Sequence, residues 1–256
     1  MSLSIVPTDA TIRDTVTDAE WQARVDLAAC YRLVDHYDMT DLALTHIAAR
    51  VPDEPDAILL NPWGVFFEEI TASSLIKMGL DGEQRSDSAF EVNRTAYVIH
   101  SAIAAARPDV ACSLHTHTRA GMAVSSLDCG LLPMTQHALM FHGRTGYHDY
   151  EGVAVDEAEQ ARLAGDLADN RALILRNHGL LTVGRSIPEA FILIYYLEKA
   201  CQAQVDAMAC GTPLTPISDS TIEKTTAFFT GGTEFADKDW PAHLRRLDRL
   251  DPSYRE

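Results

Sequence analysis

The amino-acid sequence predicts an α/β fold organised as one domain over residues 1–256. Its 256 residues, 46% of them apolar, are enough to form one large core. Segments with helical periodicity alternate along the chain with short apolar stretches typical of strands. No internal repeat and no linker-like stretch divides the sequence. These three observations together favour an α/β domain.

The first quarter of the chain predicts one helix and several strands. Residues 1–16 are expected to form a loose lead-in. Thr17-Asp18-Ala19-Glu20 is a capping box that opens a core-facing helix. Residues 41–51 alternate as in a strand, and 57–60 and 65–67 are expected to be two strands joined by a turn.

The next segments lead into a short buried strand. Residues 71–75 and 80–83 are expected to be turns. A helix is predicted over roughly 89–106, because its apolar positions recur with helical spacing and Pro108 must end it. The strand that follows contains the sequence Ser113-Leu114-His115-Thr116-His117.

The second half of the chain repeats the alternation of helix and strand. Residues 121–126 look helical, and Asp156 is expected to cap a helix that runs to about Asp169. Apolar strands are predicted at 172–175 and 180–184, with His178 at a break between them. A second capping box, Ser186-Ile187-Pro188-Glu189, begins a long helix that ends before Gly211.

His115 and His117 are the first indication of chemistry. Residues i and i+2 of a strand point to the same face, so both imidazoles are directed at one point. Two neutral imidazoles supply part of the donor set of a catalytic divalent metal. An isolated His-x-His also fits two strand histidines that are hydrogen-bonded in a polar rim.

His178 is the best third donor in the sequence. It lies between Asn177 and Gly179 at the break between two strands, where the backbone can redirect a side chain. Three histidines with open coordination positions are typical of a catalytic metal. Zinc is favoured because a two-histidine iron triad usually has a carboxylate as its third ligand; manganese, cobalt and iron remain alternatives.

Composition narrows the classes of partner and the location of the protein. With 21 basic and 37 acidic residues the net charge is -16, which disfavours nucleic acids and anionic membranes. The five cysteines include no Cys-x-x-Cys pair, and neither a leader sequence nor a membrane-spanning stretch is evident. A soluble cytoplasmic protein with a small-molecule substrate is expected.

Several motifs resemble the class II aldolase/adducin family, and more closely its bacterial adducin-like branch. They are Ile70-Thr71-Ala72-Ser73-Ser74-Leu75, Arg107-Pro108-Asp109, His115-Thr116-His117-Thr118, Tyr147-His148-Asp149-Tyr150-Glu151-Gly152, Arg176-Asn177-His178-Gly179-Leu180-Leu181 and Leu247-Asp248-Arg249-Leu250-Asp251-Pro252-Ser253-Tyr254. The resemblance covers nearly the whole chain. It implies a three-layer α/β/α fold with a central, mainly antiparallel sheet. It also implies a homotetramer with sites at subunit interfaces, and zinc on His115, His117 and His178.

The sequence departs from the sugar-phosphate aldolases at the residue that transfers the proton. In those enzymes a metal stabilises the enediolate left by carbon–carbon cleavage, and a glutamate moves the proton. Ala96 occupies the position of that glutamate, and Glu91 lies about 140° away around the helix. Arg94-Thr95 replaces the serine pair that helps to hold phosphate, so a phosphorylated substrate loses support.

Other groups must then transfer the proton, or metal-bound water must do so. The candidates are Tyr147, His142 and His100, although His142 and His100 also fit structural roles. The resemblance implies a zinc-dependent carbon–carbon lyase, an aldolase or decarboxylase acting on a small oxo or hydroxy acid. The alternatives are a non-catalytic adducin-like interaction protein and a metal-dependent oxygenase on the same fold.

Overall fold

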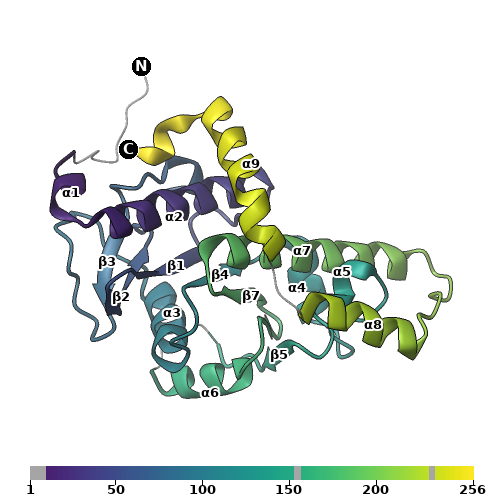
Figure 1. Cartoon of the computed structure of the whole chain (residues 1–256). Coiled ribbons are helices and arrows are strands. Elements are labelled where there is room, and N and C mark those ends of the chain that lie inside the picture. Colours follow the sequence, from purple (N-terminus) through teal and green to yellow (C-terminus); the bar gives the residue numbers. More distant parts are fainter. Residues whose placement is uncertain (1–9, 153–156, 231–233) are drawn as a thin grey trace.

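One sheet of seven strands forms the centre of the protein (Figure 1). The computed structural model describes residues 10–152, 157–230 and 234–256. The strand order is β3-β2-β1-β4-β7-β6-β5. The strands are β1 (His46–Val51), β2 (Glu54–Leu60), β3 (Ile76–Gly79), β4 (Cys112–Thr116), β5 (Thr145–His148), β6 (Ala172–Leu175) and β7 (Gly179–Gly184).

The sheet is mainly antiparallel, as expected. Only the pair β5 and β6 at one edge is parallel among the described strands. The central strand β4 pairs with β1 on one side and with β7 on the other. Strands from both halves of the chain therefore meet at β4.

Helices cover both faces of the sheet, which confirms the three-layer α/β/α architecture (Figure 1). The helices α2 and α7 pack on one face, and α3 and α6 pack on the other. The helices are α1 (Ala10–Thr15), α2 (Asp18–His36), α3 (Arg94–Ala106), α4 (Arg119–Ser125), α5 (Gln136–Leu139), α6 (Glu157–Leu167), α7 (Ile187–Ala209), α8 (Asp219–Thr230) and α9 (Glu234–Leu250), with 3-10 turns η1 (Phe67–Glu69) and η2 (Pro252–Arg255).

Side chains of β4 alternate between the two layers. Cys112 and Leu114 enter the large apolar core beneath α2 and α7. Ser113 and His115 therefore face the layer of α3 and α6, where Leu181 and Val183 of β7 belong to a separate apolar cluster. The histidine site opens on this second face.

The capping boxes predict helix starts well. The side chain of Thr17 accepts a hydrogen bond from the backbone N–H of Glu20, and that of Ser186 accepts from Glu189. The helix α3 begins at Arg94 instead of near residue 89, because Asn93 caps it by accepting from the N–H of Thr95.

Three segments differ from expectation. Residues 65–67 are not a strand: Phe67 begins η1 and packs edge-on against Tyr31 with ring centroids 4.5 Å apart. The first strand starts at His46, because Leu42 has φ = +49° and the preceding residues turn. Within the expected lead-in, residues 10–15 form α1, whereas residues 1–9 and the cap at Asp156 lie outside the described residues.

None of the helices among the described residues is both long and apolar enough to cross a lipid bilayer.

Candidate metal centre

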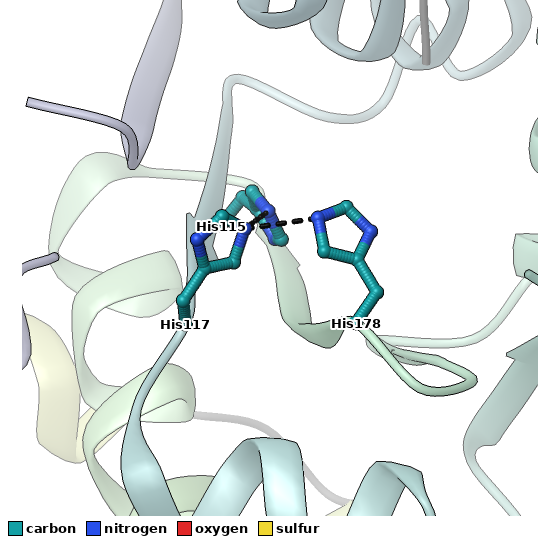
Figure 2. Close-up of side chains that lie close together, drawn as sticks. All are labelled: His115, His117 and His178. Atoms are coloured by element: carbon teal, nitrogen blue, oxygen red, sulfur yellow. Dashed lines mark hydrogen bonds between the residues drawn. The ribbon is translucent and has the colours of Figure 1, made fainter. Parts of the chain in front are cut away.

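Three histidines meet in front of the central strand (Figure 2). His115 belongs to β4, and His117 follows the end of that strand. His178 comes from the tight turn between the antiparallel strands β6 and β7, which is the break between strands that the sequence predicts. Asn177 adopts the left-handed conformation there with φ = +56°, which aims His178 back at β4.

The three imidazoles approach one another through the same ring atom. Nε2 of His117 lies 2.8 Å from Nε2 of His115 and 2.9 Å from Nε2 of His178. One nitrogen from each ring lies within 4.8 Å of the others. Among the described residues, no other group of three histidine, cysteine, aspartate or glutamate side chains lies close enough together to hold a metal ion.

Hydrogen bonds on the far side of two rings fix where their protons lie. Nδ1 of His115 lies 2.9 Å from the carbonyl oxygen of Leu180, and a carbonyl only accepts. Nδ1 of His117 lies 3.0 Å from a carboxylate oxygen of Asp41, which also accepts. Each ring in its neutral form therefore donates through Nδ1–H and directs an unprotonated Nε2 at the other.

Burial keeps the rings of His115 and His178 neutral. The pKa of His115 lies well below the usual value, first because the ring is buried and then because His46, His178 and His117 are close. Burial, with smaller contributions from His117 and His148, lowers the pKa of His178 to about 4. Neutral imidazoles are the form that binds a metal.

The arrangement fits a divalent metal. Two unprotonated nitrogens 2.8 Å apart repel each other unless a cation lies between them. Nitrogen ligands about 2.0–2.1 Å from zinc lie about 3.3 Å apart in a tetrahedron, close to the spacing here. A carbonyl and a carboxylate behind the ligand rings are the usual supports of such a site.

Gly179 allows the turn of His178 to lie close to β4. A Cβ atom at this position would meet the carbonyl oxygen of Thr116 at 2.4 Å and Cδ2 of His117 at 3.2 Å. A Cβ contact under 3.0 Å does not occur without a shift of the backbone. The approach of His178 to the other two histidines thus depends on glycine.

His100, one of the predicted catalytic residues, lies behind this site. It is fully buried on α3; its Nε2 lies 2.8 Å from Nδ1 of His46 and its Nδ1 lies 2.6 Å from Oγ of Ser113. Burial lowers its pKa to about 3. Among the described residues, His100 therefore contacts the site through His46 alone.

Tyr147 and His142, the other two predicted catalytic residues, lie away from the three histidines. The hydroxyl of Tyr147 accepts from the N–H of Leu131, and its ring stacks on Arg176. His142 is exposed and lines an open groove beside α8. Neither contacts the three histidines in the hydrogen bonds or ring contacts of the described residues, so a catalytic role for either stays a prediction.

The space around the side chain of Ala96 is filled, so no other acidic side chain can occupy it in place of the glutamate. Ala96 is 1% exposed and packs in an apolar cluster with residues such as Ile58 and Leu60 of β2.

Three residues near the centre were not predicted from the sequence. Asp41 supports His117, His46 lies beside His115 with ring centroids 5.1 Å apart, and the exposed Tyr150 lies 6.4 Å from His178 between ring centroids. The only sequence signal for any of them is the place of His46 in an alternating stretch; its pairing with His115 is seen only in the structure.

Comparison with known proteins establishes the family. Residues 25–205 match the family described as Class II Aldolase and Adducin N-terminal domain. The chain belongs to the class II aldolase/adducin family. A solved structure of an aldolase II superfamily protein from Pseudomonas syringae is 44% identical, with a TM-score of 0.91 and coverage of 96% of this chain and 99% of that one.

Members of the family differ in what they do. An L-fuculose 1-phosphate aldolase from Glaciozyma antarctica is 28% identical, with a TM-score of 0.81 and full coverage of both chains. Alpha-adducin of Rattus norvegicus is 46% identical over 189 residues, which are 73% of this chain and 26% of the adducin. Family membership therefore supports a lyase and leaves open the adducin-like alternative.

Proposed function

We propose that the protein is a zinc-dependent carbon–carbon lyase, an aldolase or decarboxylase that acts on a small oxo or hydroxy acid. His115, His117 and His178 would hold the zinc. The observation that carries the proposal is the convergence of their Nε2 atoms, with the protons of His115 and His117 held on the opposite nitrogens. The L-fuculose 1-phosphate aldolase, a structural relative, supports the lyase class.

Bound zinc supplies a Lewis acid that stabilises negative charge on an oxygen next to the carbon whose bond breaks. The protein keeps the ligands in place for this chemistry. The carbonyl of Leu180 holds the ring of His115, and the carboxylate of Asp41 holds that of His117. Both rings remain in the tautomer that presents Nε2, which costs no rearrangement during reaction.

The proton donor differs from that of the sugar-phosphate aldolases, because Ala96 replaces the expected glutamate. Tyr150 is an exposed phenol beside His178 and is the best-placed candidate for proton transfer, because Tyr147 and His142 make no contact with the three histidines among the described residues. The absence of a serine pair at Arg94-Thr95 favours a substrate without phosphate.

Metal analysis followed by a substrate screen tests the proposal. Protein purified without added metal is expected to contain about one zinc per chain. Wild type is then incubated with a panel of small 2-oxo and hydroxy acids and compared with His117→Ala, which should lose both zinc and turnover. His36→Ala is the matched control, because His36 is an exposed histidine at the end of α2. Protein without zinc, or turnover unaffected by His117→Ala, contradicts the proposal.

The adducin-like alternative rests on the 46% identity to alpha-adducin and on the loss of the glutamate at residue 96. An intact set of three open imidazoles argues against it, because a scaffold has no need of a reactive metal site. Redox-active iron instead of zinc in the purified protein favours the oxygenase alternative. The homotetramer and the cytoplasmic location stay predictions.

A further inference from the structure

A fourth histidine faces the same space as the three candidate ligands. His46 on β1 is the direct partner of His115 on β4, and paired residues of neighbouring strands point to the same face. The two rings lie 5.1 Å apart between centroids, and His46 is only 3% exposed. Water cannot solvate a ring that is this deeply buried, so other interactions must account for a polar side chain at this position.

A chain of hydrogen bonds leads from His46 into the interior. Nδ1 of His46 lies 2.8 Å from Nε2 of His100, and Nδ1 of His100 lies 2.6 Å from Oγ of Ser113. His100 has no exposed surface, and Ser113 is 4% exposed. The chain therefore ends at a buried hydroxyl.

The hydroxyl of Ser113 sets the direction of the chain. Within the described part of the protein its oxygen has one hydrogen-bond partner, Nδ1 of His100. A buried O–H without an acceptor is destabilising, so Ser113 donates to that nitrogen. His100 must then carry its proton on Nε2 and donate it to Nδ1 of His46.

His46 is thereby fixed as one tautomer. Its Nδ1 accepts a hydrogen bond and cannot also carry a proton, so the ring is neutral and protonated on Nε2. Nε2 has no hydrogen-bond partner among the residues that the structure describes. It is also absent from the fully buried polar atoms that lack a partner, so it reaches accessible space.

We propose that His46 donates a hydrogen bond from Nε2 to an oxygen atom of the substrate held at the three histidines. His100 and Ser113 are the positioning residues that keep its proton on that nitrogen. This inference rests on the proposed function and narrows its substrate class. An uncharged donor beside the candidate metal suits a carbonyl, hydroxyl or carboxylate oxygen of a small oxo or hydroxy acid.

Neutron diffraction from deuterated crystals of the metal-free protein tests the tautomer directly. Deuterium on Nε2 of His46 and on Nε2 of His100 is the expected result. Ser113→Ala should redistribute deuterium between the two nitrogens of His46, because the group that orients the chain is gone. Deuterium on Nδ1 of His46 in the wild type, or on both of its nitrogens, overturns the inference whatever metal the protein binds.

Calorimetric titration of the zinc-loaded protein with glycolate, the smallest 2-hydroxy acid, tests the contact. His46→Leu should raise the Kd of glycolate about tenfold, as expected when one hydrogen bond is lost. His46→Gln keeps an N–H donor and should recover part of the affinity. His36→Ala should bind like the wild type, and zinc content is measured for every variant.

The neutron and calorimetric experiments distinguish a failure of the proposed function from a failure of this inference. A zinc-free wild type contradicts the proposed function, while the neutron map still decides the tautomer. Zinc-loaded wild type that does not bind glycolate, or that binds it no better than His46→Leu at equal zinc content, overturns the assignment of His46 as a substrate donor.

Discussion

The protein holds two histidine-containing clusters of polar side chains whose surroundings differ. In the triad of His115, His117 and His178, three rings present nitrogen to nitrogen, and the one carboxylate, that of Asp41, lies behind the ligands. In the second cluster His148 lies between two carboxylates, 2.7 Å from Asp166 and 3.3 Å from Glu159. His148 and His178 line the same small cleft.

The difference shows how surroundings assign a role to the same side chain. In the triad, the acceptor nitrogens of His115 and His117 face each other without a positive charge between them, which a metal supplies. His148 instead has a carboxylate beside each ring nitrogen, that of Asp166 at Nδ1 and that of Glu159 at Nε2. We therefore expect the triad to govern metal binding and His148 to govern stability.

His148→Gln should produce the largest loss of stability. It removes the ring nitrogen that lies 3.3 Å from the buried carboxylate of Glu159, and a buried polar group left without its partner is expected to lower the free energy of unfolding by about 1–3 kcal/mol. Urea unfolding of the metal-free protein measures this. The double variant His148→Gln/Glu159→Gln should recover part of the loss, and zinc content should not change. Loss of zinc in the single variant would show that the two clusters are not separable.

Asp41→Asn should affect the other cluster. The neutral amide holds Nδ1–H of His117 more weakly than a carboxylate does, so zinc affinity should fall about 10- to 100-fold. Competition with a chromophoric chelator measures the affinity. Asp38→Asn is the control, because Asp38 is an exposed aspartate of the same loop. Equal affinity of both variants contradicts a supporting role for Asp41.

Acidification should destabilise the metal-free protein. Burial lowers the pKa of His100 to about 3 and that of His178 to about 4, whereas unfolded histidines titrate near pH 6.5. Below pH 6.5 the unfolded chain binds more protons, so stability falls by up to about 1.4 kcal/mol per pH unit for each such histidine. Urea midpoints at pH 7.5 and 5.5 test this, and His100→Asn should reduce the slope. A midpoint that rises on acidification rules it out.

Arg162→Ala should have the smallest effect. Arg162 pairs with Glu151 of the same motif as His148, but both side chains are substantially exposed. Exposed pairs contribute little to stability, and salt reduces the contribution further. A decrease in the free energy of unfolding as large as that of His148→Gln would contradict this expectation, because the exposed pair would then stabilise the protein as much as the buried contact does.

Local signals in the sequence predict most of the fold. The capping boxes at Thr17 and Ser186 identify the starts of α2 and α7, because each depends on residues three apart. The Val-Phe-Phe stretch at 65–67 misleads, since its strand propensity gives way to the packing of Phe67 on Tyr31. Tertiary contacts decide such short apolar stretches.

The candidate site is predictable only in part. His115 and His117 are two residues apart, and His178 is marked by its flanking Asn and Gly. The sequence does not assign His46 to the site, because its position beside His115 depends on the pairing of β1 with β4, 69 residues apart. Asp41 reaches His117 from a turn whose course no local pattern specifies.

Gly179 limits how the protein can be altered. A side chain at position 179 would collide with the backbone of β4 and with His117. Every substitution of this glycine therefore disturbs the arrangement of the three histidines. In a saturation library, changes at this position should be purged whether selection acts on folding or on turnover. New chemistry on this scaffold must therefore come from the walls of the site, such as Tyr150 and His46, and not from the turn that delivers His178.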